Sequence, residues 1–306
     1  MNIFITGGMG YVGSILSAML IQNGHRITVI ERNPGKKPSP PQGVTVIEAD
    51  ASKPGPWQNA LAEHDTVINL AGVSIFSRWG KRKKDEIYYS RILITRNVVD
   101  ALKKRAGKKT DLLSASAVGY YGFHGDETIT ESDAPGDDFL ARVCRDWESE
   151  ALRAEQYGTR VVLTRFGVIL GGNGGALNLL TKIFRFRLGS RLGSGRQWFS
   201  WIHADDLKTA LNYLLSRRGI SGAINCTAPH PVTNRELTKA MNRALGAFPL
   251  VPPAPAFMLR SLLGELGNFV LKGQRAVPRR LQDLGFTFKY PDIDKALIDL
   301  LKTRRL

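Results

Sequence analysis

The stretch "NIFITGGMGYVGS", residues 2–14, decides the fold. Its first half is rich in β-branched and aromatic residues, which is typical of a buried strand. The glycines that follow predict a tight turn into a helix, because the next apolar residues recur at helical spacing. Such a turn lets the backbone approach a pyrophosphate, whose charge the helix N-terminus stabilises. We therefore predict a dinucleotide site, the alternative being a structural glycine-rich turn. Its predicted members are Thr6, Gly7, Gly8, Gly10, Tyr11, Val12 and Gly13.

The chain up to about residue 170 alternates apolar runs with helical stretches. Further strands are predicted over 26–32, 43–50, 65–72, 110–122 and 159–170, and helices around 84–105 and 138–157. Near-continuous apolar runs are typical of strands buried on both faces of a parallel sheet. The alternation therefore predicts a doubly wound α/β fold of the dinucleotide-binding (Rossmann) type.

Two adjacent residues bear on the choice of cofactor. Glu31 could bind a ribose 2′-hydroxyl, which favours NAD, whereas Arg32 could pair with a 2′-phosphate, which favours NADP. A surface ion pair is the alternative. We predict NADP, with NAD as the second choice. Asp50 is a candidate for the adenine edge, and the loop of Leu70, Ala71 and Gly72 ends a strand where parallel sheets bind ligands.

After residue 170 the composition changes, and glycine, arginine and aromatic residues become frequent. We predict one domain over 1–230, with substrate-side insertions after about 170, and a smaller C-terminal domain over 245–301. The proline-rich "LVPPAPA" at 250–256 reads as a linker. The apolar stretch 255–273 is interrupted by Arg260 and Glu265, so we expect a buried or amphipathic helix rather than a membrane span.

Charge and cysteine content narrow the class of protein. The net charge of +16 lies in clusters that read as solvated helix faces, so binding to nucleic acid or to an anionic membrane is a secondary interpretation. Two cysteines in no metal-like spacing argue against a disulfide framework and a structural metal. The chain starts directly with a strand, without a secretory leader, so a cytoplasmic location is expected.

Several motifs together carry a resemblance to a known group. "TGGMGYVG", "DTVINLAG", "SASAVGYYG", "RFGVILG" and "WIHADD" resemble the extended short-chain dehydrogenase/reductase superfamily, which includes nucleotide-sugar epimerases. "GDDFLARVCRDWE", "TAPHPVTNRE" and "GQRAVPRRLQDLGFTFKYPD" resemble, more narrowly, an atypical uncharacterised epimerase family with a C-terminal domain of unknown function. The resemblance runs from Met1 to about Leu301.

The superfamily implies a catalytic Ser or Thr and a Tyr-x-x-x-Lys pair, in which Tyr moves a proton and Lys lowers its pKa. By this resemblance Ser116 is the catalytic hydroxyl, with Ser114 as the alternative. Leu140 falls at the Tyr position and Cys144 at the Lys position, and Arg91 replaces the usual Asn. Leucine cannot transfer a proton, so the usual acid is missing.

Replacement groups can be named. Tyr121, or its neighbour Tyr120, could donate the proton with Arg91 lowering its pKa, unless both rings only pack the loop. Cys144 could act as a thiolate beside a cation, although a small buried side chain is the simpler interpretation.

The loop 194–205 corresponds to the superfamily's substrate side. Arg196 and Gln197 could bind a phosphate or carboxylate there, and Trp198 could stack on a base or sugar. We interpret His203 as structural, and Arg165 as an anion ligand or a buried ion-pair partner.

Two functions follow from this sequence. The first is an NADP-binding oxidoreductase or epimerase-like enzyme acting on an anionic small molecule, for which nucleotide-linked compounds are one candidate class. The second is a non-catalytic NADP sensor or scaffold, for example in cell division, motivated by Leu140, Cys144 and Arg91. The sequence leaves monomer and dimer equally open.

Overall fold

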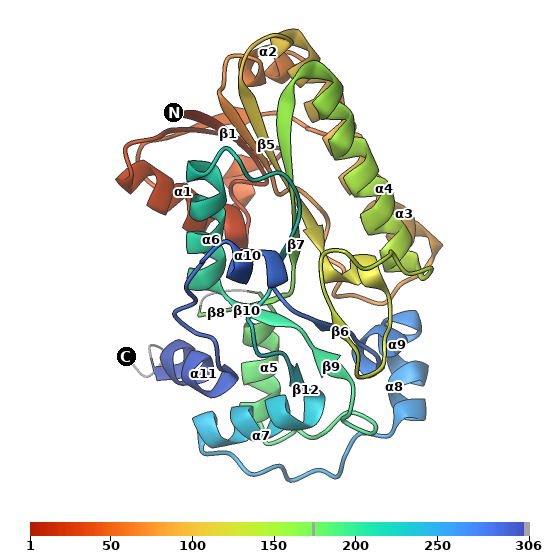
Figure 1. Cartoon of the computed structure of the whole chain (residues 1–306). Coiled ribbons are helices and arrows are strands. Elements are labelled where there is room, and N and C mark those ends of the chain that lie inside the picture. The colour runs from red at the N-terminus through yellow and green to blue at the C-terminus, as the bar shows by residue number, and fades with distance from the viewer. Residues whose placement is uncertain (173–174, 303–306) are drawn as a thin grey trace.

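Seven parallel strands form one twisted sheet at the centre of the N-terminal part (Figure 1). The computed structural model describes residues 1–172 and 175–302. The spatial order is β11-β7-β5-β4-β1-β2-β3. Strands β2 and β3 follow β1 on one side and β4 starts the other side, so the chain changes its winding direction between β1 and β4. The strands are β1 (Asn2–Thr6), β2 (Arg26–Glu31), β3 (Val44–Glu48), β4 (Thr66–Asn69), β5 (Thr110–Ala117), β7 (Thr159–Phe166) and β11 (Gly222–Cys226). The predicted doubly wound fold is confirmed.

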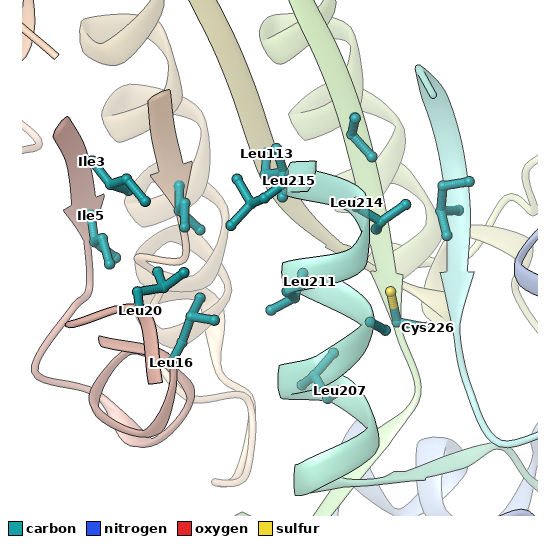
Figure 2. Packing of buried hydrophobic residues seen from close by; sticks show 14 of the residues in the cluster. Ile3, Ile5, Leu16, Leu20, Leu113, Leu207, Leu211, Leu214, Leu215 and Cys226 are labelled. Atoms are coloured by element: carbon teal, nitrogen blue, oxygen red, sulfur yellow. The ribbon is translucent and has the colours of Figure 1, made fainter. Parts of the chain in front are cut away.

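Helices cover both faces of this sheet. Because successive strand residues point to opposite faces, Ile3 and Ile5 of β1 pack with α1 (Tyr11–Gln22) and α6 (Ala204–Ser216). Figure 2 shows Leu16 and Leu20 of α1 meeting the leucines of α6 in this cluster. Phe4, between them in sequence, packs on the other side. That side is covered by α2 (Trp57–Leu61), α3 (Lys81–Leu102) and α4 (Phe139–Leu152).

The run 159–170 forms two strands, although the sequence predicts one. β7 stays in the main sheet, whereas β8 (Val168–Gly171) pairs in parallel with β10 (Trp201–His203). Gly167 lies between them, where a Cβ atom would come within 2.9 Å of the Ser200 carbonyl oxygen. At Gly167 the chain leaves the main sheet and its backbone runs close to that of Ser200. The apolar sequence pattern does not reveal this contact between distant segments.

A C-terminal lobe packs below the sheet in the view of Figure 1. Its helices are α5 (Gly175–Arg185), α7 (Asn234–Leu245), α8 (Ala256–Leu263), α9 (Glu265–Leu271) and α11 (Ile293–Lys302). In contrast, α10 (Arg279–Asp283) packs on β11, and its Leu281 joins the cluster of α1 and α6. One short strand pair, β6 (Thr128–Ile129) with β13 (Arg275–Ala276), joins it to the rest, and a second, β9 (Trp198–Phe199) with β12 (Val232–Thr233), lies against α7 within the lobe. Short 3₁₀ turns lie at Pro34–Lys36, Lys103–Arg105, Val118–Tyr121 and Arg153–Tyr157.

Polar contacts attach the C-terminal segment to α6. The buried carboxylate of Asp206 accepts hydrogen bonds from the backbone amides of Lys289 and Tyr290, at 2.8 and 2.9 Å. The His203 ring stacks on Tyr290 with 3.8 Å between ring centroids, and its Nδ1 accepts the amide of Asp205 at the start of α6. His203 therefore holds structure together, as its sequence context suggests.

The apolar stretch 255–273 forms two helices rather than one. Gly264, with φ of +60°, separates α8 from α9, since few other residues adopt that conformation at low cost. No residue of α8 is fully buried. Across residues 1–172 and 175–302, no helix combines the length and the apolar character that crossing a bilayer requires.

Candidate cofactor and active site

The glycine turn after β1 leaves no room for side chains. Gly7 has φ of +67°, and a Cβ there would lie 3.0 Å from the backbone of Ala71. A Cβ on Gly8 would come within 2.3 Å of Val29 Cγ1, and one on Gly13 within 2.4 Å of the Gly7 carbonyl oxygen. The Gly10 amide closes the turn on the Gly7 carbonyl at 2.9 Å. The glycines are therefore required by close backbone approach, as a dinucleotide turn demands.

The helix that follows presents an uncapped N-terminus. α1 starts at Tyr11, and its N-cap residue Gly10 has no side chain to satisfy the first amides. No acidic residue lies in its first turn. Backbone amides at the positive end of a helix bind anions, so this end fits a pyrophosphate. Val12 packs on the core beneath the turn. The Tyr11 hydroxyl lies so close to Gly171 that a Cβ atom on Gly171 would overlap it.

A buried hydrogen-bond network fixes the loop beside this turn. Thr6 Oγ1 donates to Asn69 Oδ1 at 2.6 Å and accepts the Ala71 amide at 3.3 Å. Asn69 Nδ2 in turn donates to Thr95 Oγ1, which also accepts from Trp147 Nε1, both at 2.8 Å. Leu70, Ala71 and Gly72 therefore lie in a fixed position at the carboxyl edge of β4.

The end of β2 carries the two residues that bear on cofactor choice. Glu31 Oε1 accepts the backbone amides of Arg32 and Asn33 at 3.0 and 3.4 Å. Asp50, at the end of β3, accepts from the Ser52 amide and hydroxyl at 3.0 and 2.7 Å. Partial burial opposes ionisation of Asp50, but the Ser52 hydrogen bonds and the nearby charges of Arg32 and Lys53 lower its pKa. Arg32 itself is exposed.

Arg91 lies directly against the cofactor loop. An ideal Cβ on Gly72 would be 3.1 Å from Arg91 Cζ, so the guanidinium occupies the space beside that glycine. Nη1 donates to the carbonyl oxygens of Val73 and Ile87, at 3.1 and 3.0 Å, and the group lies 5.3 Å from the centroid of the Trp147 ring. Burial lowers its pKa, and no carboxylate among the described residues pairs with it.

Ser116 belongs to a buried ionic network near the carboxyl end of β5. Its hydroxyl donates to Glu148 Oε1 at 2.6 Å, and Glu148 forms a two-point ion pair with Arg165 at 2.8 and 2.7 Å. These three side chains are between 2% and 5% exposed. Arg165 is thus a buried ion-pair partner, one of the two roles that its sequence position allowed. Ser114 accepts from Asn69 Nδ2 at 3.3 Å.

Tyr121 continues this network. Its hydroxyl accepts from Arg165 Nη1 at 2.9 Å and donates to Asn225 Oδ1 at 2.7 Å, and the residue is fully buried. Burial raises the pKa of Tyr121 to about 12, although Arg165 opposes the shift. The cation beside Tyr121 is therefore Arg165, where the sequence suggested Arg91. The Tyr120 ring lies 3.5 Å from Arg165 Cζ.

Cys144 and Leu140 lie on the buried face of α4. Burial raises the pKa of Cys144 to about 12, and the Glu148 charge acts in the same direction while Arg91 opposes it. Glu148 was not singled out from the sequence. The spacing of Glu148 could have predicted its burial. Leu140, Cys144 and Glu148 follow one another at intervals of four, which places this carboxylate on the apolar face of the helix.

In the predicted substrate loop, Gln197 and Trp198 are hydrogen-bonded to other parts of the protein, whereas Arg196 is exposed to solvent. Gln197 Nε2 donates to the carbonyl oxygens of Leu192 and Val270, both at 3.1 Å, so it holds the loop in place. Trp198 Nε1 donates to Asp126 Oδ1 at 2.8 Å, and the Arg275 guanidinium lies 4.7 Å from its ring centroid. Arg196 is exposed.

A second residue missed from the sequence links this loop to the 3₁₀ turn Val118–Tyr121 that follows β5. Gln274 Nε2 donates to the Val118 carbonyl oxygen at 2.7 Å, and its own carbonyl oxygen accepts from the Ser200 hydroxyl at 2.8 Å. Within 1–172 and 175–302, His, Cys, Asp and Glu form no group of three that could hold a metal ion.

The reversed sheet order, the glycine cradle and the open end of α1 together define a dinucleotide-binding protein of the Rossmann type. The chain belongs to the NAD dependent epimerase/dehydratase family, whose model matches residues 3–226, and a domain of unknown function matches residues 254–300. The resemblance drawn from the sequence motifs is confirmed.

Similar proteins cover the whole chain. The epimerase family protein YfhF of Bacillus subtilis is 39% identical, over 100% of this chain and 99% of its own length. A chloroplastic homologue of epimerase family protein SDR39U1 from Arabidopsis thaliana is 40% identical, over 97% and 86%. The crystal structure of human SDR39U1 with NADPH superposes with a TM-score of 0.84 at 29% identity, covering 99% of both chains.

Proposed function

We propose that the protein is an NADP(H)-dependent oxidoreductase or epimerase that acts on an anionic small molecule, with nucleotide-linked sugars as the first class to test. The observation that carries the proposal is the cradle of Gly7, Gly8 and Gly13 beside an uncapped helix end, which fits a dinucleotide pyrophosphate. Bound NADP(H) would supply the hydride acceptor or donor.

The choice of NADP rests on the end of β2. Glu31 is hydrogen-bonded to its own following amides, while the exposed Arg32 leaves its guanidinium available for a 2′-phosphate. The similar human protein was crystallised with NADPH, which supports the same choice.

Arg91 is the proposed active-site cation. It lies beside Gly72 without a carboxylate partner, and its charge reaches Cys144, the position where the superfamily has lysine. A buried cation is stabilised when an anion or an oxygen-rich group binds it. Arg91 would thus supply from α3 the positive charge that α4 lacks.

The substrate side would be lined by Arg196 and Trp198. Gln197 would position both residues, through its hydrogen bonds to the Leu192 and Val270 carbonyl oxygens. An exposed guanidinium and a neighbouring indole ring are suited to an anionic group next to a planar one.

One observation favours a second candidate, a non-catalytic NADP sensor or scaffold. Ser116, Tyr121 and Cys144 are all buried, and the two hydroxyls are bonded to protein groups. None of the three presents a free proton donor to solvent.

One experiment separates the two. Purified protein is titrated with NADPH by fluorescence, and the complex is then incubated with a panel of nucleotide sugars and with fractionated metabolites. Nicotinamide absorbance reports net redox in both directions, and proton NMR reports epimerised products. We expect turnover with one substrate class, reduced at least tenfold in Arg91→Ala and partly retained in Arg91→Lys. Tight NADPH binding without turnover in either readout would favour the sensor.

A further inference from the structure

Large apolar side chains are exposed at the end of the molecule opposite the seven-stranded sheet. In Figure 1 this end holds α5, α7 and the segment that runs from α7 to α8. Fifteen large hydrophobic residues are exposed among those the structure describes, and six of them lie on α5 or in the segments that follow α5 and α7. Of these six, Phe186 and Phe248 are 75% and 78% exposed. Such a concentration of exposed apolar surface marks an interaction site.

Two segments bring four of these residues together. Leu188 donates its amide to the Ile183 carbonyl, which turns the chain after α5, and the Leu250 amide donates to the Arg187 carbonyl at 2.9 Å. Residues 186–188 and 248–250 therefore lie side by side. We call Phe186, Leu188, Phe248 and Leu250 the apolar tip. On α5, Leu179 and Ile183 are one turn apart and exposed next to it.

The backbone at this tip is strained. Arg187 has φ of +59° and is the one non-glycine residue with positive φ in the part of the chain that the structure describes. Glycine would adopt this conformation at lower cost. In this turn the cation Arg187 lies between the exposed apolar residues Phe186 and Leu188.

The two chain segments that form the tip carry charge of a single sign, although Arg243 of α7 pairs with Asp294 of α11. Residues 175–203 contain five Lys and Arg and no Asp or Glu, and residues 237–264 contain three and none. Lys182, Arg185 and Arg187 are exposed among the apolar side chains. Apolar residues interleaved with cations match the interface of a bilayer that contains anionic phospholipids. We propose that the apolar tip binds such a membrane surface peripherally, independently of the function proposed above.

Other occupants fit these residues less well. A second copy would bring two surfaces of the same charge together, which opposes association. Single-stranded nucleic acid binds by stacking on a series of aromatic rings, whereas here only Phe186 and Phe248 are aromatic and four exposed neighbours, Leu179, Ile183, Leu188 and Leu250, are aliphatic.

The first test is sedimentation with lipid vesicles. The full chain is mixed with vesicles of phosphatidylcholine alone, or with 30% phosphatidylglycerol, at low and at 0.5 M salt. We expect at least tenfold stronger partitioning onto the anionic vesicles, weakened by salt. The double variant Phe248→Ser/Leu250→Ser should lose at least tenfold, and Leu284→Ser/Ile298→Ser, at exposed apolar positions outside the tip, should bind as the parent does.

The second test measures insertion. Cys144 and Cys226 are buried, so Phe248→Cys can be labelled selectively with an environment-sensitive fluorophore, and Ile298→Cys serves as the control. We expect a blue shift with anionic vesicles at position 248 and none at 298. Absence of vesicle binding, an equal loss in both double variants, or a label at 248 that stays in water would overturn the proposal. So would a dimer, or a complex with an acidic protein, that needs Phe248 and Leu250 while vesicles do not bind.

Discussion

Ser116 donates its hydroxyl to Glu148 over 2.6 Å, and the two side chains are only 2% and 5% exposed. The carboxylate that receives this bond is also the one that neutralises Arg165. The Ser116 hydroxyl, to which the superfamily resemblance gives a catalytic role, therefore donates its hydrogen bond to a buried ion pair. The cation that lies beside the loop of Leu70, Ala71 and Gly72 is Arg91, on a different helix from Glu148.

The ion pair makes a prediction for stability. Glu148→Ala should lower the free energy of unfolding by about 3–5 kcal/mol, because Arg165 would be left as an uncompensated buried charge. Urea denaturation measures the loss. Glu86→Ala is the matched control, since its pair with Arg82 lies on the surface and should contribute less than about 1 kcal/mol. Equal losses in the two variants would contradict the assignment, as would a Glu148→Ala/Arg165→Ala double variant that loses the full sum of the single losses.

The glycine cradle makes a prediction for cofactor binding. Gly13→Ala would place a Cβ 2.4 Å from the Gly7 carbonyl oxygen and push the turn apart. Overpacking of about 1–3 kcal/mol should weaken NADPH binding by roughly 5- to 150-fold. Fluorescence titration gives the dissociation constant. Gly219→Ala, where nothing lies within 4 Å, should bind as the parent does. Unchanged affinity in Gly13→Ala would show that the pyrophosphate is bound elsewhere.

These two sites differ in how far the sequence predicts them. Most of the cradle is local: Gly13 meets Gly7 and Gly8, and Gly8 meets Val29 of the next strand, so their spacing carries this geometry. The contact of Gly7 with Ala71, which follows β4, depends on the fold. Local sequence likewise predicts the strands, since the burial of Ile3 and Ile5 on one face of the sheet and of Phe4 on the other follows from one apolar run between two helix layers.

The ionic network is assembled from distant segments. Tyr121 donates to Asn225, which is 104 residues away, and Ser116 to Glu148, which is 32 residues away. No local pattern specifies which cation meets which hydroxyl, so Arg165 took the place beside Tyr121 that Arg91 was expected to fill. The break of the run 159–170 at Gly167 has the same origin, because it depends on the backbone of Ser200.

Arg32 should determine the preference for NADPH over NADH. Arg32→Ala would remove a charged hydrogen bond of about 1.5–3 kcal/mol to the 2′-phosphate, so NADPH should bind roughly 10- to 150-fold more weakly and NADH about equally well. Competitive titration with the two cofactors measures both constants. Arg26→Ala, an exposed arginine at the opposite end of β2, should change neither. Losses of equal size for both cofactors would remove Arg32 from the phosphate site.

The buried thiols should respond to pH in a defined direction. Burial raises the pKa of Cys144 from 9.0 to about 12, and that of Cys226 also rises. The native protein should therefore resist thiol reagents at pH 8 and release both thiols only in denaturant.

The same shift links stability to alkaline pH. A raised native pKa means that the unfolded chain releases its proton first, so the contribution of Cys144 is complete below about pH 9 and is lost as pH rises toward about 12. Urea unfolding between pH 8 and 11 should show a steeper fall in the parent than in Cys144→Ala. The cavity in the variant lowers its stability by an amount that does not depend on pH, so only the slopes are compared. Parallel curves would mean that the Cys144 thiol titrates alike in the folded and unfolded chains.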